Sequence, residues 1–178
     1  MISFKNKEDY ELAKKLRDHG MRKDKKYWHD EIGFNFRMTN IQAAIGCAQI
    51  EKANKFINRK INIFKRYRLN LVKIKFIKMI KLSPKIRNSH WLTFIILKDS
   101  LKRDKLLAFL NSKGIEVRSG FYSAHEMNIY KNFINKKINY FNSKKISSSI
   151  ITLPSSVSLK NDEIDYICKL IKSFFKSV

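Results

Sequence analysis

The run Trp91–Leu97 constrains the fold most, because its residues are almost all apolar and do not alternate with polar ones. Such a run is typical of a β-strand that is buried on both faces of a sheet. It is far shorter than the roughly 20 residues of a membrane-spanning helix. The elements predicted to follow are a helix, two strands and a last helix, at Leu101–Lys113, Ile115–Phe121, Ile150–Leu153 and Asp162–Lys176. This order predicts a small α/β layer domain.

Residues 21–38 keep neither the period of a helix nor that of a strand, and they are rich in aromatic and hydrogen-bonding side chains. An irregular segment of this kind is where a binding function is expected first. The preceding residues, 7–19, have apolar positions at helical spacing, which predicts a helix. Gly20 follows where that helix needs a left-handed C-cap.

A strong signal for a helix start comes after this irregular segment. Thr39 and Gln42 have the spacing of a capping box, in which each side chain bonds the backbone of the other residue. Residues 43–48 are unusually small, which favours close packing of this helix against a larger body. A second apolar stripe runs from Ile57 to Leu71. The run of small residues and this apolar stripe belong to one bent helix or to two helices, and the sequence does not decide between them.

The chain is strongly basic, with 38 lysines and arginines against 15 acidic residues and a net charge of +23. Such a charge promotes non-specific binding of polyanions. The basic residues are spread from Lys5 to Lys176, and the sequence has no zinc-finger spacing, aromatic RNA-binding signature or basic zipper. We therefore expect no specific nucleic-acid partner, although a basic nucleic-acid-binding protein remains an alternative.

Other function classes find little support in the sequence. The start Met1–Lys5 lacks the basic head and apolar body of a signal peptide, and Cys47 and Cys168 are far apart and have no metal-ligand spacing. We expect two reduced thiols, no membrane partner, no metal and a cytoplasmic location. No Gly-rich phosphate loop, nucleophile elbow or HExxH pair is present. Each of the four histidines, taken alone, is expected to be a surface or structurally satisfied imidazole.

Three parts of the chain, in order, are similar to a single protein family. They are Arg17–Gly46 apart from residues 22–26, Gly114–His125, and Leu153–Pro154 with Asp162–Ile164. These parts resemble the DegT/DnrJ/EryC1/StrS family of pyridoxal-phosphate (PLP) aminotransferases, which act on nucleotide-linked keto sugars. The perosamine-synthase-like members are the most similar in character. The resemblance covers only the C-terminal half of the family's fold.

The resemblance implies an α/β fold, namely the C-terminal part of a fold-type-I PLP-dependent transferase. Residues 1–38 are then the tail of the large PLP-binding domain, residues 39–71 the connecting helices, and residues 72–178 the small C-terminal α/β domain. The lysine that forms the Schiff base with the cofactor would precede Met1. The resemblance therefore implies a truncated chain that holds no catalytic residue and is inactive by itself.

The resemblance also implies contacts with cofactor and substrate. In the family the active site lies at a dimer interface, and the asparagine of a Gly-x-Asn-x-Arg segment reaches the cofactor phosphate of the neighbouring subunit. Asn35 holds this position, and Arg37 would add positive charge or brace the loop. Trp28 has packing in a core as its alternative role, and Ser123 replaces the proline that is usual in relatives. The residues placed near the sugar nucleotide are Tyr27, Trp28, His29, Arg118, Tyr122 and His125.

The implied reaction moves an amino group from glutamate to the cofactor and then to a nucleotide-linked 4-keto-6-deoxy sugar, for surface polysaccharides such as O-antigen. The implied partners are a second identical subunit, the nucleotide sugar and glutamate. A different class of function also fits the chain: a non-catalytic partner of a separately encoded N-terminal half. In either case the helix with residues 43–48 would lose its cover in the isolated chain and expose apolar surface.

Overall fold

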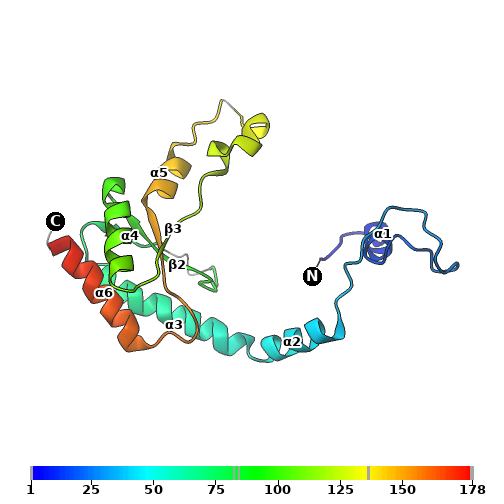
Figure 1. The fold of residues 1–178 in the computed structure, drawn as a ribbon, viewed down its shortest axis with the longest axis horizontal. Helices are drawn as coiled ribbons and strands as arrows, with labels where there is room; N and C mark the ends of the chain where they lie inside the picture. The colour runs from blue at the N-terminus through cyan, green and yellow to red at the C-terminus, as the bar shows by residue number, and fades with distance from the viewer. Residues whose placement is uncertain (1, 82, 84, 136, 177–178) are drawn as a thin grey trace. The chain divides into compact units, whose positions relative to one another are not determined.

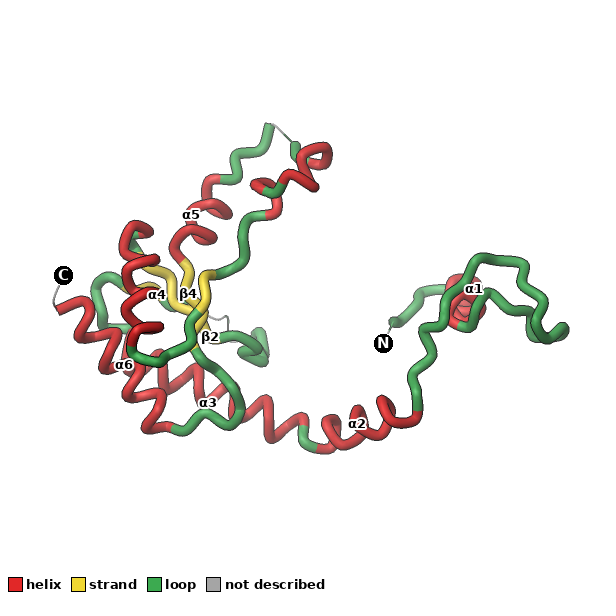
Figure 2. The backbone as a smooth tube through the Cα atoms, viewed as in Figure 1, coloured by secondary structure: helices red, strands yellow, loops and turns green. Residues whose placement is uncertain are grey.

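The computed structural model shows a protein built from helices and one small sheet (Figures 1 and 2). It describes residues 2–81, 83, 85–135 and 137–176. Over these residues, no helix is both long enough and apolar enough to cross a membrane. The mixture of helices and sheet confirms the predicted α/β class.

The chain divides into two compact units, Met1–Lys52 and Ala53–Val178. The division falls between helix α2 (Asn40–Glu51) and helix α3 (Ala53–Leu71). The run of small residues at 43–48 and the apolar stripe from Ile57 to Leu71 therefore belong to two helices. The division lies inside the segment that the resemblance assigns to the connecting helices, residues 39–71.

The sheet of the second unit has four strands in the order β1, β2, β4, β3, and all neighbouring pairs are antiparallel. In this order the strands are Ile77–Lys78, Thr93–Leu97, Ile150–Leu153 and Arg118–Ser119. At the centre of the sheet, Ile95 lies opposite Ile151. The predicted strands that became β2 and β4 are confirmed. The strand predicted over Ile115–Phe121 is reduced to the two residues of β3.

Only one face of the sheet is fully buried. Along β2, Thr93, Ile95 and Leu97 are buried, whereas the alternate residues Phe94 and Ile96 are half-buried. The prediction that this strand is buried on both faces was therefore wrong. A continuous apolar run does not distinguish a strand covered on both faces from one covered on a single face, because the covering elements come from elsewhere in the chain.

The core lies against the buried face of the sheet and is completed by three helices, α3, α4 (Arg103–Ser112) and α6 (Asn161–Lys176). Helix α6 contacts both α3 and α4, and α4 contacts β4 (Figure 1). The helices contribute apolar side chains that are almost fully buried, among them Ile63, Tyr67, Leu106, Leu110, Ile164 and Ile167. Cys168 also lies in this core, where burial raises the pKa of its thiol to about 12 and keeps it protonated.

Polar contacts tie α3 to the segment that follows β4. The guanidinium of Arg66 forms a bidentate ion pair with Asp165 of α6. The Tyr67 hydroxyl donates to the Pro154 carbonyl at 3.0 Å, and Lys60 Nζ donates to the Trp91 carbonyl at 3.0 Å. These bonds hold the ends of β2 and β4 against the same helix.

Residues between β3 and β4 include elements that the sequence did not predict. Helix α5 covers Phe141–Ser149, and two short 3-10 helices cover Ala124–Glu126 and Asn128–Phe133. Ser123 is buried and accepts a hydrogen bond from the Ser143 hydroxyl of α5 at 3.1 Å. Ser123 therefore anchors this segment to α5.

The first unit has almost no interior. It contains α1 (Lys7–Arg17), the irregular segment and α2, and among its described residues only Gly20 is buried. The capping box of Thr39 and Gln42 is confirmed. Helix α2 has no buried residue, and Ile45 is 59% exposed. Within this unit no described residue buries α2, so the apolar side chains of this helix are exposed there, as the sequence predicted.

Candidate functional site

The irregular segment is held against the end of α1 by backbone hydrogen bonds. Phe34 N donates to the Leu16 carbonyl at 2.9 Å, and Phe36 N donates to the Arg17 carbonyl at 3.0 Å. In return, His19 N donates to the Phe34 carbonyl at 3.0 Å. Residues 34–36 are thereby fixed in an extended conformation across the C-terminus of the helix.

Two glycines allow this close approach. Gly20 has the predicted left-handed conformation, with φ +67°, but it is not the C-cap, because α1 ends at Arg17 and is capped by Asp18. Gly20 faces Gly33 across the two chain segments. A Cβ atom on Gly33 would overlap the backbone of Gly20, and a Cβ on Gly20 would overlap the carbonyl of Glu31. Both positions therefore require glycine, since a backbone neighbour cannot move aside as a flexible side chain can.

Replacing Gly33 with alanine should detach the segment from α1. The overlap with backbone atoms should cost about 1–3 kcal/mol, as overpacking does elsewhere. Hydrogen exchange should report this as faster exchange of the Phe34 and Phe36 amides, by roughly 10-fold or more. Gly46→Ala is the matched control, because nothing lies within 4 Å of a Cβ at Gly46. This control should leave the exchange rates of the Phe34 and Phe36 amides unchanged and stabilise helix α2 by about 1 kcal/mol. Equal exchange in both variants would contradict the close-approach argument.

Asn35 lies on the surface of this segment. Its side-chain Oδ1 accepts a hydrogen bond from Arg37 N at 3.2 Å, which orients the amide. No described residue bonds to its Nδ2, so both of that atom's hydrogens are free to meet a ligand. The Arg37 guanidinium donates one hydrogen bond to Asp18 at 3.2 Å and is otherwise accessible, with 62% of its side chain exposed. An amide donor and a guanidinium on one segment are the groups that bind an anion such as a phosphate.

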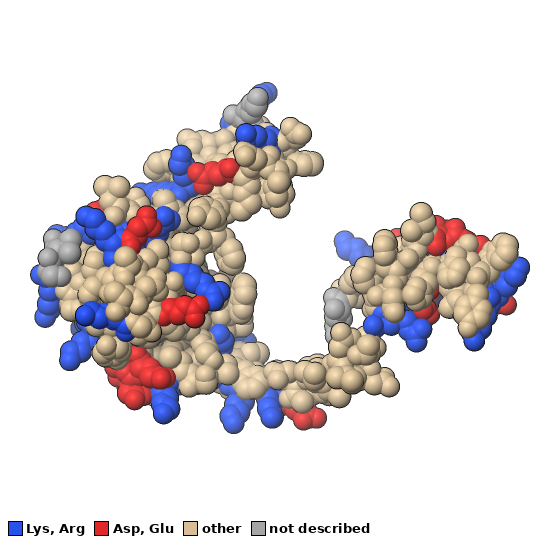
Figure 3. Space-filling model, viewed as in Figure 1, with Lys and Arg blue, Asp and Glu red and all other residues tan. Residues whose placement is uncertain are grey.

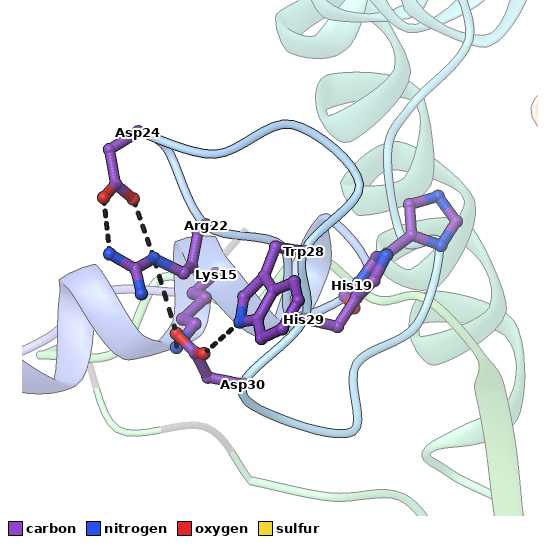
Figure 4. Close-up of polar contacts among 7 residues, drawn as sticks. All are labelled: Lys15, His19, Arg22, Asp24, Trp28, His29 and Asp30. Carbon is purple, nitrogen blue, oxygen red and sulfur yellow. Dashed lines mark hydrogen bonds and ion pairs between the residues drawn. The ribbon is translucent and has the colours of Figure 1, made fainter.

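Asp30 connects Trp28 to α1 (Figure 4). The Trp28 indole N–H donates to Asp30 Oδ1 at 3.2 Å, and Lys15 Nζ pairs with Asp30 Oδ2 at the same distance. Trp28 is 49% exposed, so it does not pack in a core. Asp30 was missed by the sequence analysis, because an acid in a polar segment carries no signal of the partners that surround it.

The other two aromatic candidates of this segment differ in their surroundings. The His29 ring bonds to the His19 carbonyl through Nδ1 at 2.8 Å and so helps to close the turn. Tyr27 is 76% exposed, with φ +63° and the Lys26 ammonium 5.0 Å from its ring centre. The structure thus brings Trp28 and His29 into one hydrogen-bonded segment with Asn35 and leaves Tyr27 at its surface.

The candidates of the second unit do not form one cluster. Arg118 pairs with Glu116, Nε to Oε1 at 3.1 Å, beside a groove of about 690 Å³. Tyr122 is 73% exposed. The His125 ring stacks on Tyr140, with ring centres 4.4 Å apart. These three residues therefore have three different environments, and they belong to a different unit from Asn35.

The sequence profile of the DegT/DnrJ/EryC1/StrS aminotransferase family matches residues 1–172. The chain is 34% identical over 175 residues to GDP-perosamine synthase of Escherichia coli O157:H7. It is 37% identical over 166 residues to GDP-perosamine synthase of Vibrio cholerae. The chain therefore belongs to the DegT/DnrJ/EryC1/StrS aminotransferase family.

The matches cover most of this chain but only part of each relative. They include 98% and 92% of this chain, against 47% and 45% of the Escherichia coli and Vibrio cholerae proteins. The chain thus spans about half the length of the curated relatives it matches, and the matched part is their C-terminal half.

A solved structure supports the fold. The aminotransferase TlmJ from Streptoalloteichus hindustanus superposes with a TM-score of 0.88 at 18% identity, over 98% of this chain and 47% of that one. A similarity at this identity concerns the fold alone. It confirms the prediction of a partial aminotransferase fold.

Proposed function

We propose that this chain supplies part of a PLP-dependent aminotransferase that transfers an amino group from glutamate to a nucleotide-linked 4-keto-6-deoxy sugar. The relatives named as GDP-perosamine synthases favour a GDP-linked substrate and a role in surface polysaccharide synthesis. The observation that carries the proposal is the exposed amide of Asn35, oriented by Arg37 within the part of the chain that the family matches. The expected location is the cytoplasm.

The residues of the irregular segment fit the phosphate of PLP. Asn35 Nδ2 has two hydrogens without described partners, and the Arg37 guanidinium adds positive charge on the same segment. When bound, PLP supplies the electron sink that amino transfer requires. The task of Asn35 and Arg37 is to bind and orient its phosphate. Arg118, Tyr122 and His125 are proposed for the substrate side, together with Tyr27, Trp28 and His29.

The proposed assembly is a homodimer, because an exposed apolar segment needs a cover. Ile32, Phe36 and Ile41 are each more than 70% exposed in a unit that has no core of its own. Large exposed apolar side chains of this kind favour an interface. Since the family's Schiff-base lysine has no counterpart in the matched segments, we propose that the 178 residues by themselves do not transaminate.

A nucleic-acid role gains no support from the distribution of charge. Figure 3 shows lysines and arginines scattered over the visible face, with acidic residues among them, rather than gathered in one patch. Binding that depends only on this charge should disappear at high salt.

The proposal is tested by supplying the N-terminal half of a full-length relative. The chain is coexpressed with the N-terminal half of the Vibrio cholerae relative, and amino transfer from glutamate to GDP-4-keto-6-deoxymannose is measured. We expect activity and the visible absorbance of bound PLP only when both chains are present. The chain alone should be at least roughly 1,000-fold less active, because the covalent anchor of the cofactor is missing. Bound PLP without amino transfer would favour a non-catalytic partner. The absence of both bound PLP and amino transfer would overturn the proposal.

A further inference from the structure

A pocket of about 300 Å³ lies on the less covered face of the sheet in the second unit. From the sheet, Phe94 and Thr152 line it, and both alternate with the core residues of their strands. Phe64 of α3 and the segment before β2 form one side, and Phe121 lies at another. Every residue that lines the pocket belongs to the same compact unit.

His90 is one of the polar residues that line this pocket, together with Asn88, Ser89 and Thr152. It is only 7% exposed, and its ring stacks on Phe64 with ring centres 3.9 Å apart and planes 17° apart. Its backbone has a φ of +50°, and the His90 backbone N–H donates a hydrogen bond to Asn88 Oδ1 at 2.7 Å. No described residue hydrogen bonds to the His90 ring, and its nitrogens are not among the fully buried unpaired polar atoms of the described residues, so they remain open to solvent in the pocket. The ring therefore presents unused hydrogen-bonding atoms in an apolar surrounding.

Burial lowers the pKa of His90, so its imidazole is neutral at pH 7. A neutral imidazole offers one N–H donor and one nitrogen acceptor. This combination suits the edge of a heterocycle, which also carries donors and acceptors side by side. It does not suit an isolated phosphate, which would be held by charge.

Aromatic side chains surround this polar group. Trp91 is 69% exposed and Phe121 75% exposed, so both rings at the pocket have faces free for contact. Aromatic rings bind planar bases by stacking, because every base has a π face. The volume is at the lower limit of ligand pockets, which span about 300–1,000 Å³. It accommodates one ring system rather than a complete nucleotide sugar.

We infer that this pocket binds the nucleobase of the nucleotide sugar, with Trp91 or Phe121 stacked on the base and His90 bonded to its edge. The choice of a nucleotide as ligand rests on the proposed function. The demand for a planar heterocycle comes from the pocket itself.

The first test measures binding to the full 178-residue chain. The chain has two tryptophans, so Trp28→Phe leaves Trp91 as the only indole reporter. Guanosine and GDP should quench its fluorescence in a saturable manner, because a stacked base contacts the ring. Ribose 5-phosphate and pyrophosphate should not. Quenching by pyrophosphate alone, or no response to guanosine, would overturn the inference.

A second test uses paired variants. Phe121→Ala should weaken guanosine binding by about 10-fold, as the loss of one base–aromatic stack does. Phe133→Ala is the matched control, since Phe133 is 85% exposed and does not line the pocket. It should bind guanosine like the parent chain. Equal guanosine affinities for the parent chain and both variants would show that Phe121 does not contact the base.

His90→Phe keeps a ring to stack on Phe64 but removes the edge hydrogen bonds. We expect guanosine binding to weaken by about 3- to 10-fold, and the unfolding midpoint to fall slightly, because phenylalanine tolerates the φ of +50° less well than histidine. If this variant does not fold, His90→Gly takes its place, because glycine adopts a positive φ freely and has no side chain that could bond the edge of a base. It should weaken binding in the same direction. Unchanged affinity in a folded variant would refute the role of His90.

The outcomes separate this inference from the proposed function. If guanosine binds but the coexpressed halves transfer no amino group, the inference of a nucleobase pocket is retained and the proposed function is rejected. If amino transfer occurs and the Phe121 and His90 variants keep the parental KM for the GDP-linked sugar, the proposed function holds and the nucleobase pocket is rejected.

Discussion

Replacing Asn35 with aspartate should weaken PLP binding to the coexpressed enzyme by roughly 10- to 100-fold. The reason is that a hydrogen bond to a charged group contributes about 1.5–3 kcal/mol, and the new carboxylate would also repel the phosphate. Aspartate keeps the oxygen that accepts from Arg37 N, so the conformation of the segment should persist. The measurement is a titration of apoenzyme with PLP, followed by visible absorbance. It reports cofactor binding directly rather than activity.

Asn6→Asp is the control for this variant. Asn6 caps α1 by accepting a hydrogen bond from Asp9 N, and aspartate retains that acceptor while adding the same charge. It should leave PLP affinity unchanged. Equal affinity for the Asn35 and Asn6 variants would mean that Asn35 only shapes its own turn, and the cofactor contact would be rejected.

Ile151→Ala should destabilise the second unit by about 2–5 kcal/mol, since Ile151 is fully buried in the central strand β4. Urea unfolding of the chain should show this as a lower midpoint. The first unit has no buried apolar side chain among its described residues, so the cooperative transition should report the second unit. The expected loss combines the transfer free energy of the side chain with the cavity left between sheet and helices.

The matched control is Ile45→Ala, the same change on the exposed side of α2. Ile45 is 59% exposed, and its loss should alter the unfolding free energy by less than about 0.5 kcal/mol. A large effect at Ile45 would indicate that α2 is already covered in solution, as in a dimer. A small effect at Ile151 would contradict the core described here.

Local signals in the sequence predicted much of the fold. The capping box at Thr39, the left-handed Gly20 and the strands β2 and β4 all followed from short-range rules of backbone geometry and apolar spacing. Such rules act within a few residues, so no knowledge of distant chain segments was required. The 3-10 helices and α5 carried no comparable signal, because their apolar residues, such as Phe133 and Phe141, remain exposed.

The sequence by itself determined the family, through the ordered segments around Asn35 and before His125, and with it the candidate residues. Only the tertiary structure decided which face of β2 is covered, that Asp30 holds Trp28, and that the His90 ring stacks on Phe64 and bonds to no described residue. These are contacts between residues that the backbone brings together in space. Their free energies depend on which groups exclude water from one another, and spacing along the chain does not encode that.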